Sequence, residues 1–264
     1  MNRSHRAAWQ LPIGVSRGLW EYATADHIAD GYDDYFAFNR LFELDGQVLA
    51  RHFHLRDDGP SWVADLGCGT GRALVPLVER GFHGLAVDLS QRMLEIVEEK
   101  AHQGDLPIVC VRANLVELDC LPDASVDYAM SLFSTLGMIR GWRNRVQAMR
   151  ETRRILKPGG VFVLHLHNYW YNLYDPGGPW WVISNWLQSW FSREVEAGDR
   201  YFEYRGVPNM FLHVFTRGEI KRLLRASGFR LRELIPLDTR RDRLLPRPWL
   251  LQSLRANGWI IVCD

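Results

Sequence analysis

The chain of 264 residues is long enough for one large domain, and a composition with 47% hydrophobic and 24% charged residues is typical of a globular protein with an apolar core. A formal net charge of +1 excludes a global electrostatic field that would draw it to nucleic acid or to a membrane. The N-terminus lacks a long apolar stretch, so we expect neither a signal peptide nor a membrane span. The four cysteines show no metal-type pairing, which predicts reduced thiols in a cytoplasmic protein.

The first two thirds of the chain alternate between apolar runs and helical patterns. Residues 33–53 carry aromatic and aliphatic side chains at helical spacing, which predicts one or two helices. The expected elements that follow are strand 61–66, helix 71–80, strand 84–87, helix 91–101, strand 107–111, strand 126–132, helix 142–156 and strand 161–166. Gly81 is expected to end one helix and Ser90 to N-cap the next, while residues 157–160 form a turn. This alternation favours a mostly parallel sheet with helices on both faces.

The last third departs from this pattern before regular structure resumes. Residues 168–205 are aromatic-rich, and we expect them to be irregular. Thr216 can N-cap a helix, and Glu219 three residues later completes a capping box. That helix is expected to end near Gly228, and residues 229–235 and 259–263 supply two final strands.

A glycine-rich loop after the first predicted strand carries the main functional signal. It reads Asp65-Leu66-Gly67-Cys68-Gly69-Thr70-Gly71. Glycines let the chain turn sharply and let a ligand approach the backbone. The carboxylate of Asp65 disfavours a pyrophosphate but suits a cationic ligand, and the Gly-x-Gly-x-Gly spacing argues against a dinucleotide-dependent oxidoreductase. The loop resembles motif I of the class I S-adenosylmethionine (SAM) methyltransferases.

From residue 61 to 166 the chain resembles the core of that family. The resemblance implies an α/β, Rossmann-like, doubly wound and mostly parallel seven-stranded sheet with the last strand antiparallel, plus N-terminal helices and an aromatic-rich insertion after strand five. One domain is then expected over 1–264, with an N-terminal helical lid (1–58), a SAM-binding core (61–167), a substrate-lid insertion (168–212) and a C-terminal helix with strands (213–264).

The same resemblance, together with the chemistry of the side chains, assigns a cofactor site. Backbone amides around Gly67, Cys68, Gly69 and Gly71 are expected to hold the methionine carboxylate, with Asp65 near the ammonium group. Asp88, 21 residues after Gly67, is placed to accept both ribose hydroxyls. The remaining expected contacts are Leu89 and Met93 on adenine, Asn114 and Leu115 at its amino group, Ser131 and Phe133 beside the sulfur, and Tyr22 or Tyr32 as a cover.

The end of the fifth predicted strand supplies the candidate catalytic residues His167, Asn168 and Tyr169. His165 and His167 alternate onto one face, and a histidine is a plausible general base. A structural role is favoured for His165, and both roles stay open for His167. No third ligand accompanies the pair, so no metal is expected. Ser134 and Thr135 either orient a substrate or cap a turn.

The aromatic segment 169–191 allows three interpretations. Its tyrosines and tryptophans line a pocket over the sulfur, pack the insertion onto the core, or form an interfacial helix on lipid. On one helical face lie Ile183, Trp186, Leu187 and Trp190. The lipid interpretation is the weakest, because the segment has no lysine and only Arg193 just past its end.

These features predict a methyltransferase acting on O, N or C of a small molecule. One alternative is a tRNA methyltransferase. Residues 209–219 and 257–259 resemble the C-terminal segment of wobble-uridine carboxymethyl methyltransferases, and the tail is rich in arginine. The arginines are Arg230, Arg232, Arg240, Arg241, Arg243, Arg247 and Arg255. A second alternative is a non-catalytic SAM-binding partner subunit.

Overall fold

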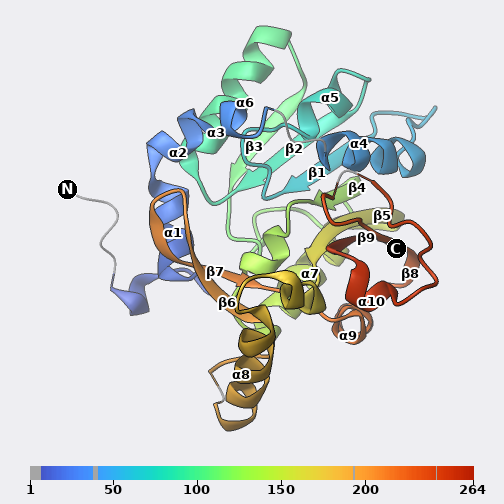
Figure 1. Ribbon diagram of the computed structural model, residues 1–264. Helices are drawn as coiled ribbons and strands as arrows, with labels where there is room; N and C mark the ends of the chain where they lie inside the picture. Colours follow the sequence, from blue (N-terminus) through green and yellow to red (C-terminus); the bar gives the residue numbers. More distant parts are fainter. Residues whose placement is uncertain (1–6, 38–40, 193, 242) are drawn as a thin grey trace.

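The computed structural model describes residues 7–37, 41–192, 194–241 and 243–264, so Arg193 lies outside the described residues. Within them, seven strands form one sheet in the order β3-β2-β1-β4-β5-β9-β8 (Figure 1). The strands are β1 Trp62–Leu66, β2 His83–Asp88, β3 Ile108–Arg112, β4 Val126–Ser131, β5 Leu156–His167, β8 Leu231–Pro236 and β9 Gly258–Cys263. The last strand, β9, runs antiparallel to both neighbours, whereas β1 to β5 are parallel. The predicted fold class is confirmed.

Helices cover both faces of this sheet. One apolar core lies under α7 (Trp142–Ile155) and α9 (Arg217–Ser227), and the other under α4 (Leu41–His52), α5 (Leu74–Val78) and α6 (Gln91–Gly104). Successive residues of a strand enter opposite cores, as Phe162 and Val163 of β5 do. Because both faces are buried, the strand reads in the sequence as a continuous apolar run.

Most predicted boundaries agree with the structure to within a few residues, and three differ. The helix expected over 71–80 is only α5, because Gly71 has φ 79° and cannot be helical. Gly81 does close that helix end, since its N–H donates to Val78 O and the N–H of Phe82 donates to Leu77 O. The turn expected at 157–160 lies within β5 as a bulge, where the register against β4 shifts and Gly159 has φ 80°.

The third difference is the segment expected to be irregular. It contains the 3-10 helix η3 (Tyr169–Tyr174), the helix α8 (Gly178–Phe191) and the strand β6 (Asp199–Tyr204), which pairs with β7 (Val207–His213) as a hairpin. Pro179 stands in the first turn of α8, where a missing N–H costs nothing. Figure 1 shows α8 projecting from the body of the molecule. Its outer side carries the exposed Trp180, Ile183, Trp186, Leu187, Trp190 and Phe191.

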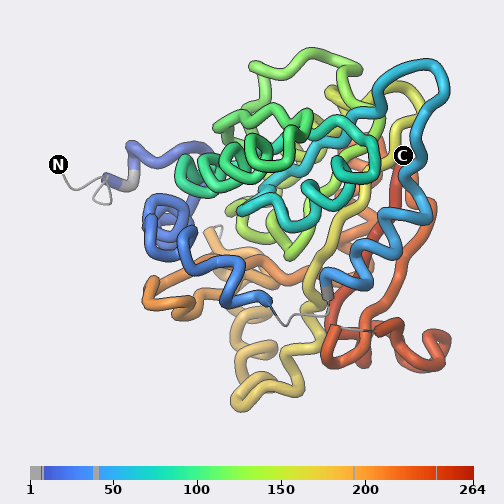
Figure 2. The backbone as a smooth tube through the Cα atoms, turned by 90° about the horizontal axis from the view of Figure 1, so that it is seen from above, coloured from blue at the N-terminus to red at the C-terminus, as the bar shows by residue number. Residues whose placement is uncertain are grey.

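The N-terminal helices α1 (Arg17–Thr24), α2 (Asp26–Asp30) and α3 (Tyr32–Tyr35) form a roof beside the β6–β7 hairpin (Figures 1 and 2). α1 packs so closely on β7 that a Cβ at Gly18 would lie 2.4 Å from Asn209 O. Two ion pairs fasten the roof to α6, Asp33 with Lys100 at 2.6 Å and Asp30 with Arg92 at 2.8 Å. No helix of the described residues is both long and apolar enough to cross a membrane.

Candidate active site

A cavity of about 640 Å³ lies at the carboxyl ends of the parallel strands, between the roof and the hairpin. Each of the five parallel strands delivers at least one residue to it, for example Gly67 after β1, Asp88 from β2, Asn114 after β3, Phe133 after β4 and His167 from β5. Open parallel sheets bind ligands at this edge, and the volume is typical of a small-molecule site.

The glycine loop forms one wall of this cavity. The N–H groups of Gly67 and Cys68 donate to Val87 O at 2.8 and 3.1 Å, which folds the loop back over the end of β2. Gly67 has φ 86°, and a Cβ there would lie 2.3 Å from Cγ2 of Thr135. Only glycine therefore fits at this position, because any side chain would meet both backbone strain and a steric clash.

Asp88 is fixed at the next strand end by backbone amides. Its Oδ2 accepts from Gly69 N–H at 2.9 Å, and its Oδ1 accepts from Ser90 N–H at 2.8 Å. Burial raises the pKa of Asp88, and its hydrogen bonds from backbone N–H groups offset part of that rise. A carboxylate held in this way at a cavity wall is suited to accept hydrogen bonds from a diol.

The structure brings most of the predicted cofactor residues to the cavity. Those that line it are Gly67, Gly69, Asp88, Leu89, Met93, Asn114, Leu115 and Phe133. Those that do not are Asp65, Cys68, Gly71 and Ser131. Burial and the nearby Asp88 raise the pKa of Asp65 to about 8, and Ser131 donates its hydroxyl to Leu66 O.

Asn114 and two tyrosines of the roof lie beside the cavity wall that the glycine loop forms. The side-chain N–H of Asn114 donates to Ile13 O at 2.9 Å, and its Oδ1 accepts from Val116 N–H, so this amide ties the N-terminal segment to the end of β3. Tyr22 and Tyr32 line the cavity, and the ring of Tyr32 comes within 3.6 Å of the Cβ position at Gly69. Sequence reasoning identified both tyrosines but missed the ion pairs of Asp30 and Asp33 that hold them there.

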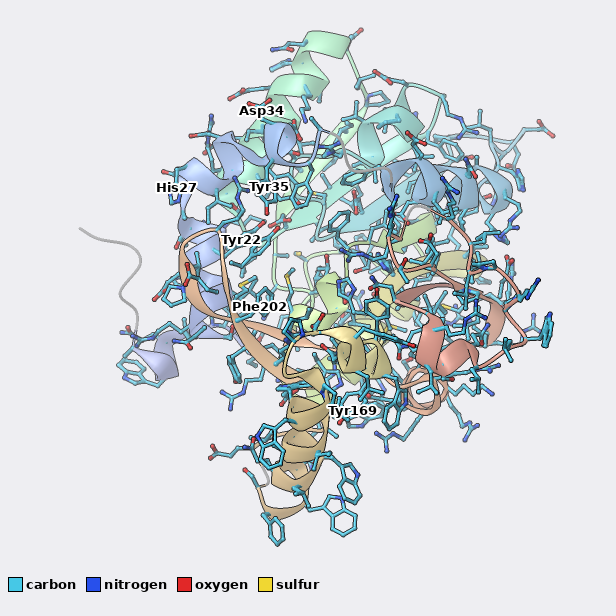
Figure 3. The ribbon with its side chains drawn as sticks, viewed as in Figure 1. Tyr22, His27, Asp34, Tyr35, Tyr169 and Phe202 are labelled. Carbon is cyan, nitrogen blue, oxygen red and sulfur yellow. The ribbon has the colours of Figure 1, made fainter. Side chains whose placement is uncertain are left out.

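The three candidate catalytic residues separate into different environments. His167 lines the cavity; burial and then the charge of Arg241 lower its pKa to about 3, so its ring is neutral near pH 7. Asn168 also lines the cavity, but its side-chain N–H groups donate to Ser253 O and Ala256 O and its Oδ1 accepts from Trp170 N–H. Tyr169 is outside the cavity lining, and its hydroxyl donates to Val182 O (Figure 3).

His165 lies wholly in the core, consistent with the favoured structural role. Neither ring nitrogen has a hydrogen-bond partner among the described residues. Burial lowers the pKa of His165 well below its usual value, so the ring is neutral.

The part of the cavity wall that does not come from the strand ends was largely missed by sequence reasoning. It takes Phe202 and Tyr204 from β6, Met210 and Leu212 from β7, and Arg241 from the C-terminal tail. Figure 3 shows Tyr22, Tyr35 and Phe202, which line the same cavity, on the same side of the molecule. The sequence signal that could have found β6 is a period-two alternation. Residues 202 and 204 line the cavity, whereas Tyr201 and Glu203 face solvent.

Most of the aromatic segment 169–191 lies elsewhere. Of its tyrosines and tryptophans, Tyr171 alone lines the cavity. Trp181 packs against Tyr169, whereas Trp180 and Trp190 are more than two thirds exposed. The expected aromatic pocket is therefore not built by α8, because the helix runs away from the sheet edge.

A buried charge network holds the hairpin to α7 and α9. His213 Nδ1 lies 2.7 Å from Asp199 Oδ1, and its Nε2 lies 2.9 Å from Glu219 Oε1. Burial alone would lower the pKa of His213, but these two hydrogen bonds outweigh it and raise the pKa. The buried Arg145 pairs with Glu196 beside them. Ligand atoms of Glu196, Asp199 and His213 lie within 4.8 Å of one another, yet all three residues are engaged in these pairs.

Comparisons with known proteins agree with this geometry. Residues 64–164 match the model of the methyltransferase domain family. An uncharacterized protein of Methanocaldococcus jannaschii is 28% identical over 180 residues, 68% of this chain and 61% of that protein. The demethylmenaquinone methyltransferase of Listeria welshimeri is 35% identical over 103 residues, 37% of this chain and 41% of that enzyme. The chain thus spans less than two thirds of either relative.

A solved structure with the same fold is the 1,6-didemethyltoxoflavin-N1-methyltransferase of Burkholderia thailandensis, with bound 1,6-didemethyltoxoflavin and S-adenosylhomocysteine. It superposes with a TM-score of 0.60 at 17% identity, covering 90% of this chain and 83% of that one.

The cavity fits the cofactor of such enzymes. The backbone at Gly67 leaves a cradle that a Cβ would fill, and Asp88 presents an oriented carboxylate. The order of the sheet, the glycine loop and the match to the methyltransferase domain all point to the same fold. Residues 64–164 thus carry a methyltransferase domain, and the sheet has the fold of solved SAM-dependent methyltransferases.

Proposed function

We propose that this protein transfers a methyl group to an O, N or C nucleophile of a small-molecule acceptor. The observation that carries the proposal is the continuity of one cavity, which joins Gly67 and Asp88 on one side to His167 and the hairpin wall on the other. A donor and an acceptor bound there would share one space closed by the roof, and holding two reactants together is the main source of rate in such a transfer.

The cofactor half is assigned to the strand ends. Gly67 and Gly69 would hold the methionine end of SAM against their backbone, Asp88 would accept the ribose hydroxyls, and Leu89 with Met93 would pack on adenine. When bound, SAM would supply an electrophilic methyl group, with the electron pair of the C–S bond remaining on sulfur and an electron pair of the acceptor atom forming the new bond. The remaining tasks of the chain are to orient the acceptor and exclude water.

The acceptor half has an apolar wall suited to a small organic molecule. Phe202, Met210 and Leu212 present aromatic and aliphatic groups, and Tyr35 and Phe36 close the opposite side. The Listeria relative and the Burkholderia structure are both named for small-molecule acceptors, which supports the same class here.

His167 is proposed as a positioning residue at the boundary of the two halves. A pKa of about 3 makes its ring a weak proton acceptor, so it is poorly matched to general base catalysis near pH 7. A neutral ring can still accept a hydrogen bond from the acceptor. The variant His167→Ala is expected to lower turnover while leaving the Kd for SAM unchanged, and His167→Gln, which keeps an acceptor atom, should restore part of the activity.

The distribution of the tail arginines weakens the tRNA alternative. Arg230 and Arg232 both pair with Asp264 at 2.9 Å, and Arg255 donates to three backbone carbonyl oxygens. Arg241 lies in the cavity rather than on the surface. Arginines already paired in this way offer little to a phosphate backbone.

The test is a turnover assay that follows conversion of SAM to S-adenosylhomocysteine with a panel of small organic acceptors, run beside bulk tRNA at low and moderate salt. The expected result is turnover with a small organic acceptor and no turnover with tRNA. Turnover on tRNA that falls steeply with salt would overturn the small-molecule assignment. Tight SAM binding without turnover on any acceptor would favour a non-catalytic partner subunit.

A further inference from the structure

One charged side chain in the acceptor half, Arg241, has no acidic partner in contact among the residues that the structure describes. Arg241 stands in the turn between β8 and β9, which is closed by a bridge between Leu237 and Leu244 and by the hydrogen bond from Asp238 N–H to Arg243 O. Its own N–H donates to Asp238 O at 3.2 Å, and its φ of 60° is unusual for a residue with a Cβ. The turn therefore holds Arg241 at the cavity wall.

The guanidinium of Arg241 differs from that of Arg200, the other arginine lining the cavity. Arg200 forms an ion pair with Asp175 at 2.9 Å. Within the part of the chain that the structure describes, no carboxylate forms an ion pair with Arg241. Its Nη1 lies 3.4 Å from both ring nitrogens of His167, at the outer limit of a hydrogen bond.

Partial burial makes a charge without a contacting carboxylate costly. Desolvation lowers the pKa of Arg241, opposed by Tyr171, Tyr204 and the more distant Asp45. Asp45 is 2% exposed, and neither of its oxygens has a hydrogen-bond partner among the described residues. A buried guanidinium needs a contacting anion to recover its lost hydration. Among the described residues none lies at contact distance, so the cavity is arranged for a ligand that supplies the anion.

We propose that Arg241 binds a carboxylate of the methyl acceptor, which makes the substrate an organic acid. This inference rests on the proposed function and narrows its substrate class. A guanidinium matches a carboxylate through two parallel N–H donors. Tyr171, Tyr204 and Asn257 line the same region and supply further polar groups, while Phe202 and Met210 face the apolar part of the acid.

The arrangement also separates the two charges of the reaction. The cofactor half contains the carboxylate of Asp88, which suits a donor of net positive charge, and the acceptor half presents the cation of Arg241 toward an anionic substrate. The cofactor half thereby repels an anionic acceptor and the acceptor half repels a cationic donor, which favours binding of each molecule in its own half.

The binding test uses three probes on the full chain saturated with S-adenosylhomocysteine: benzoate, the neutral isostere benzamide, and phenyl phosphate. Benzoate is expected to raise the thermal midpoint, and benzamide to have no effect. In Arg241→Gln the response to benzoate should vanish, whereas Arg225→Gln, which removes an exposed charge from α9, should respond like the wild type. Equal responses to benzoate and benzamide, or a response to phenyl phosphate alone, would overturn the carboxylate assignment.

Two further readouts separate binding from a structural role. The thermal midpoint of Arg241→Gln without ligand should equal or exceed that of the wild type, since a buried unpaired charge is removed. With a carboxylate acceptor, KM should rise by about 10-fold to 100-fold with kcat little changed, and Arg241→Lys should recover part of the loss. A lower midpoint together with a weaker Kd for SAM would assign Arg241 to the fold and end the proposal.

The outcome also distinguishes this inference from the proposed function. If wild-type protein binds no SAM, the proposed function fails. If SAM binds and carboxylate acceptors are methylated with equal KM by wild type and Arg241→Gln, the proposed function stands and the carboxylate site alone is wrong.

Discussion

The two halves of the cavity are built by different means. The cofactor half consists of strand ends, where backbone N–H groups of Gly69 and Ser90 orient Asp88 and a glycine at 67 keeps the wall open. The acceptor half consists of side chains delivered by the roof, the hairpin and the tail. A backbone-built wall is set by the sheet itself and tolerates few changes, whereas a side-chain wall can be altered residue by residue without disturbing the fold. The backbone-built wall belongs to the fold that this molecule shares with its relatives, whereas the side chains of the other wall would select its acceptor.

The largest expected effect is on the backbone wall. Gly67→Val places a Cβ 2.3 Å from Thr135 Cγ2 at φ 86°, and should cost about 2–4 kcal/mol of stability and abolish SAM binding by calorimetry. Gly159→Val is the control, because its φ of 80° carries similar strain but nothing lies within 4 Å of the added Cβ. Its Kd for SAM should be unchanged. A Gly67→Val protein that binds SAM as tightly as the wild type would mean that the loop is not the cofactor wall.

A smaller change tests the one carboxylate of that half. Asp88→Asn keeps the shape but turns an N–H₂ group toward Gly69 N–H or Ser90 N–H and removes the charge. We expect SAM affinity to fall by about 10-fold to 100-fold, the range for a hydrogen bond to a charged group. Asp105→Asn, at an exposed helix end, is the matched control. Calorimetry that gives the same Kd for both variants would remove Asp88 from the site.

The buried Asp45 of α4, outside the cavity lining, predicts a pH dependence of stability. Burial raises its pKa to about 7, against an opposing effect of Arg241. The folded state therefore retains a proton that the unfolded chain releases near pH 4. Stability is lost as pH rises from about 4 to 7, by about 1.4 kcal/mol per pH unit, and the loss stops above 7. Urea unfolding of Asp45→Asn should show a shallower decline between pH 5 and 7 than the wild type. An identical decline in both proteins would contradict the assignment, and the exposed Asp34→Asn controls for surface charge.

The smallest effects compare two helix caps, Ser90, which lines the cavity, and Thr216, which does not. Ser90 Oγ accepts from Met93 N–H ahead of α6, and Thr216 Oγ1 accepts from Glu219 N–H ahead of α9. Ser90→Ala and Thr216→Val should each lose about 1 kcal/mol in urea unfolding. A much larger loss for Thr216→Val would show that the cap also supports the charge network around Glu219.

The sheet and its cofactor edge were predictable because their signals are local. Strands buried on both faces appear as apolar runs such as 161–166, and positive φ after β1 requires the glycines that mark the loop. The helix after the loop was predicted too long because the sequence does not show that Gly71 has φ 79° and that α5 begins only at Leu74.

The acceptor half could not be predicted in the same way. Residues of β6 face a cavity rather than a core, so polar Arg200 and Tyr204 occupy positions where a core strand would show aliphatic residues. Glu219 of the expected capping box receives a hydrogen bond from His213 instead, a partner that only the hairpin brings close. Arg241 reads like its neighbours in an arginine-rich tail, and only tertiary structure shows that it is the one among them that lines the cavity.

The buried charges around His213 have a consequence for how this enzyme could be redesigned or could diverge. Breaking a buried pair of this kind costs about 3–5 kcal/mol, so the hairpin cannot slide over α7 and α9 as a loosely packed loop would. The backbone of the hairpin is therefore held in place, and the side chains of Phe202, Met210 and Leu212, which line the cavity, can be exchanged on it. New acceptor preferences should be reachable by point substitution at these positions, with the backbone unchanged, and libraries that spare His213, Asp199, Glu219 and Arg145 should retain the most folded members.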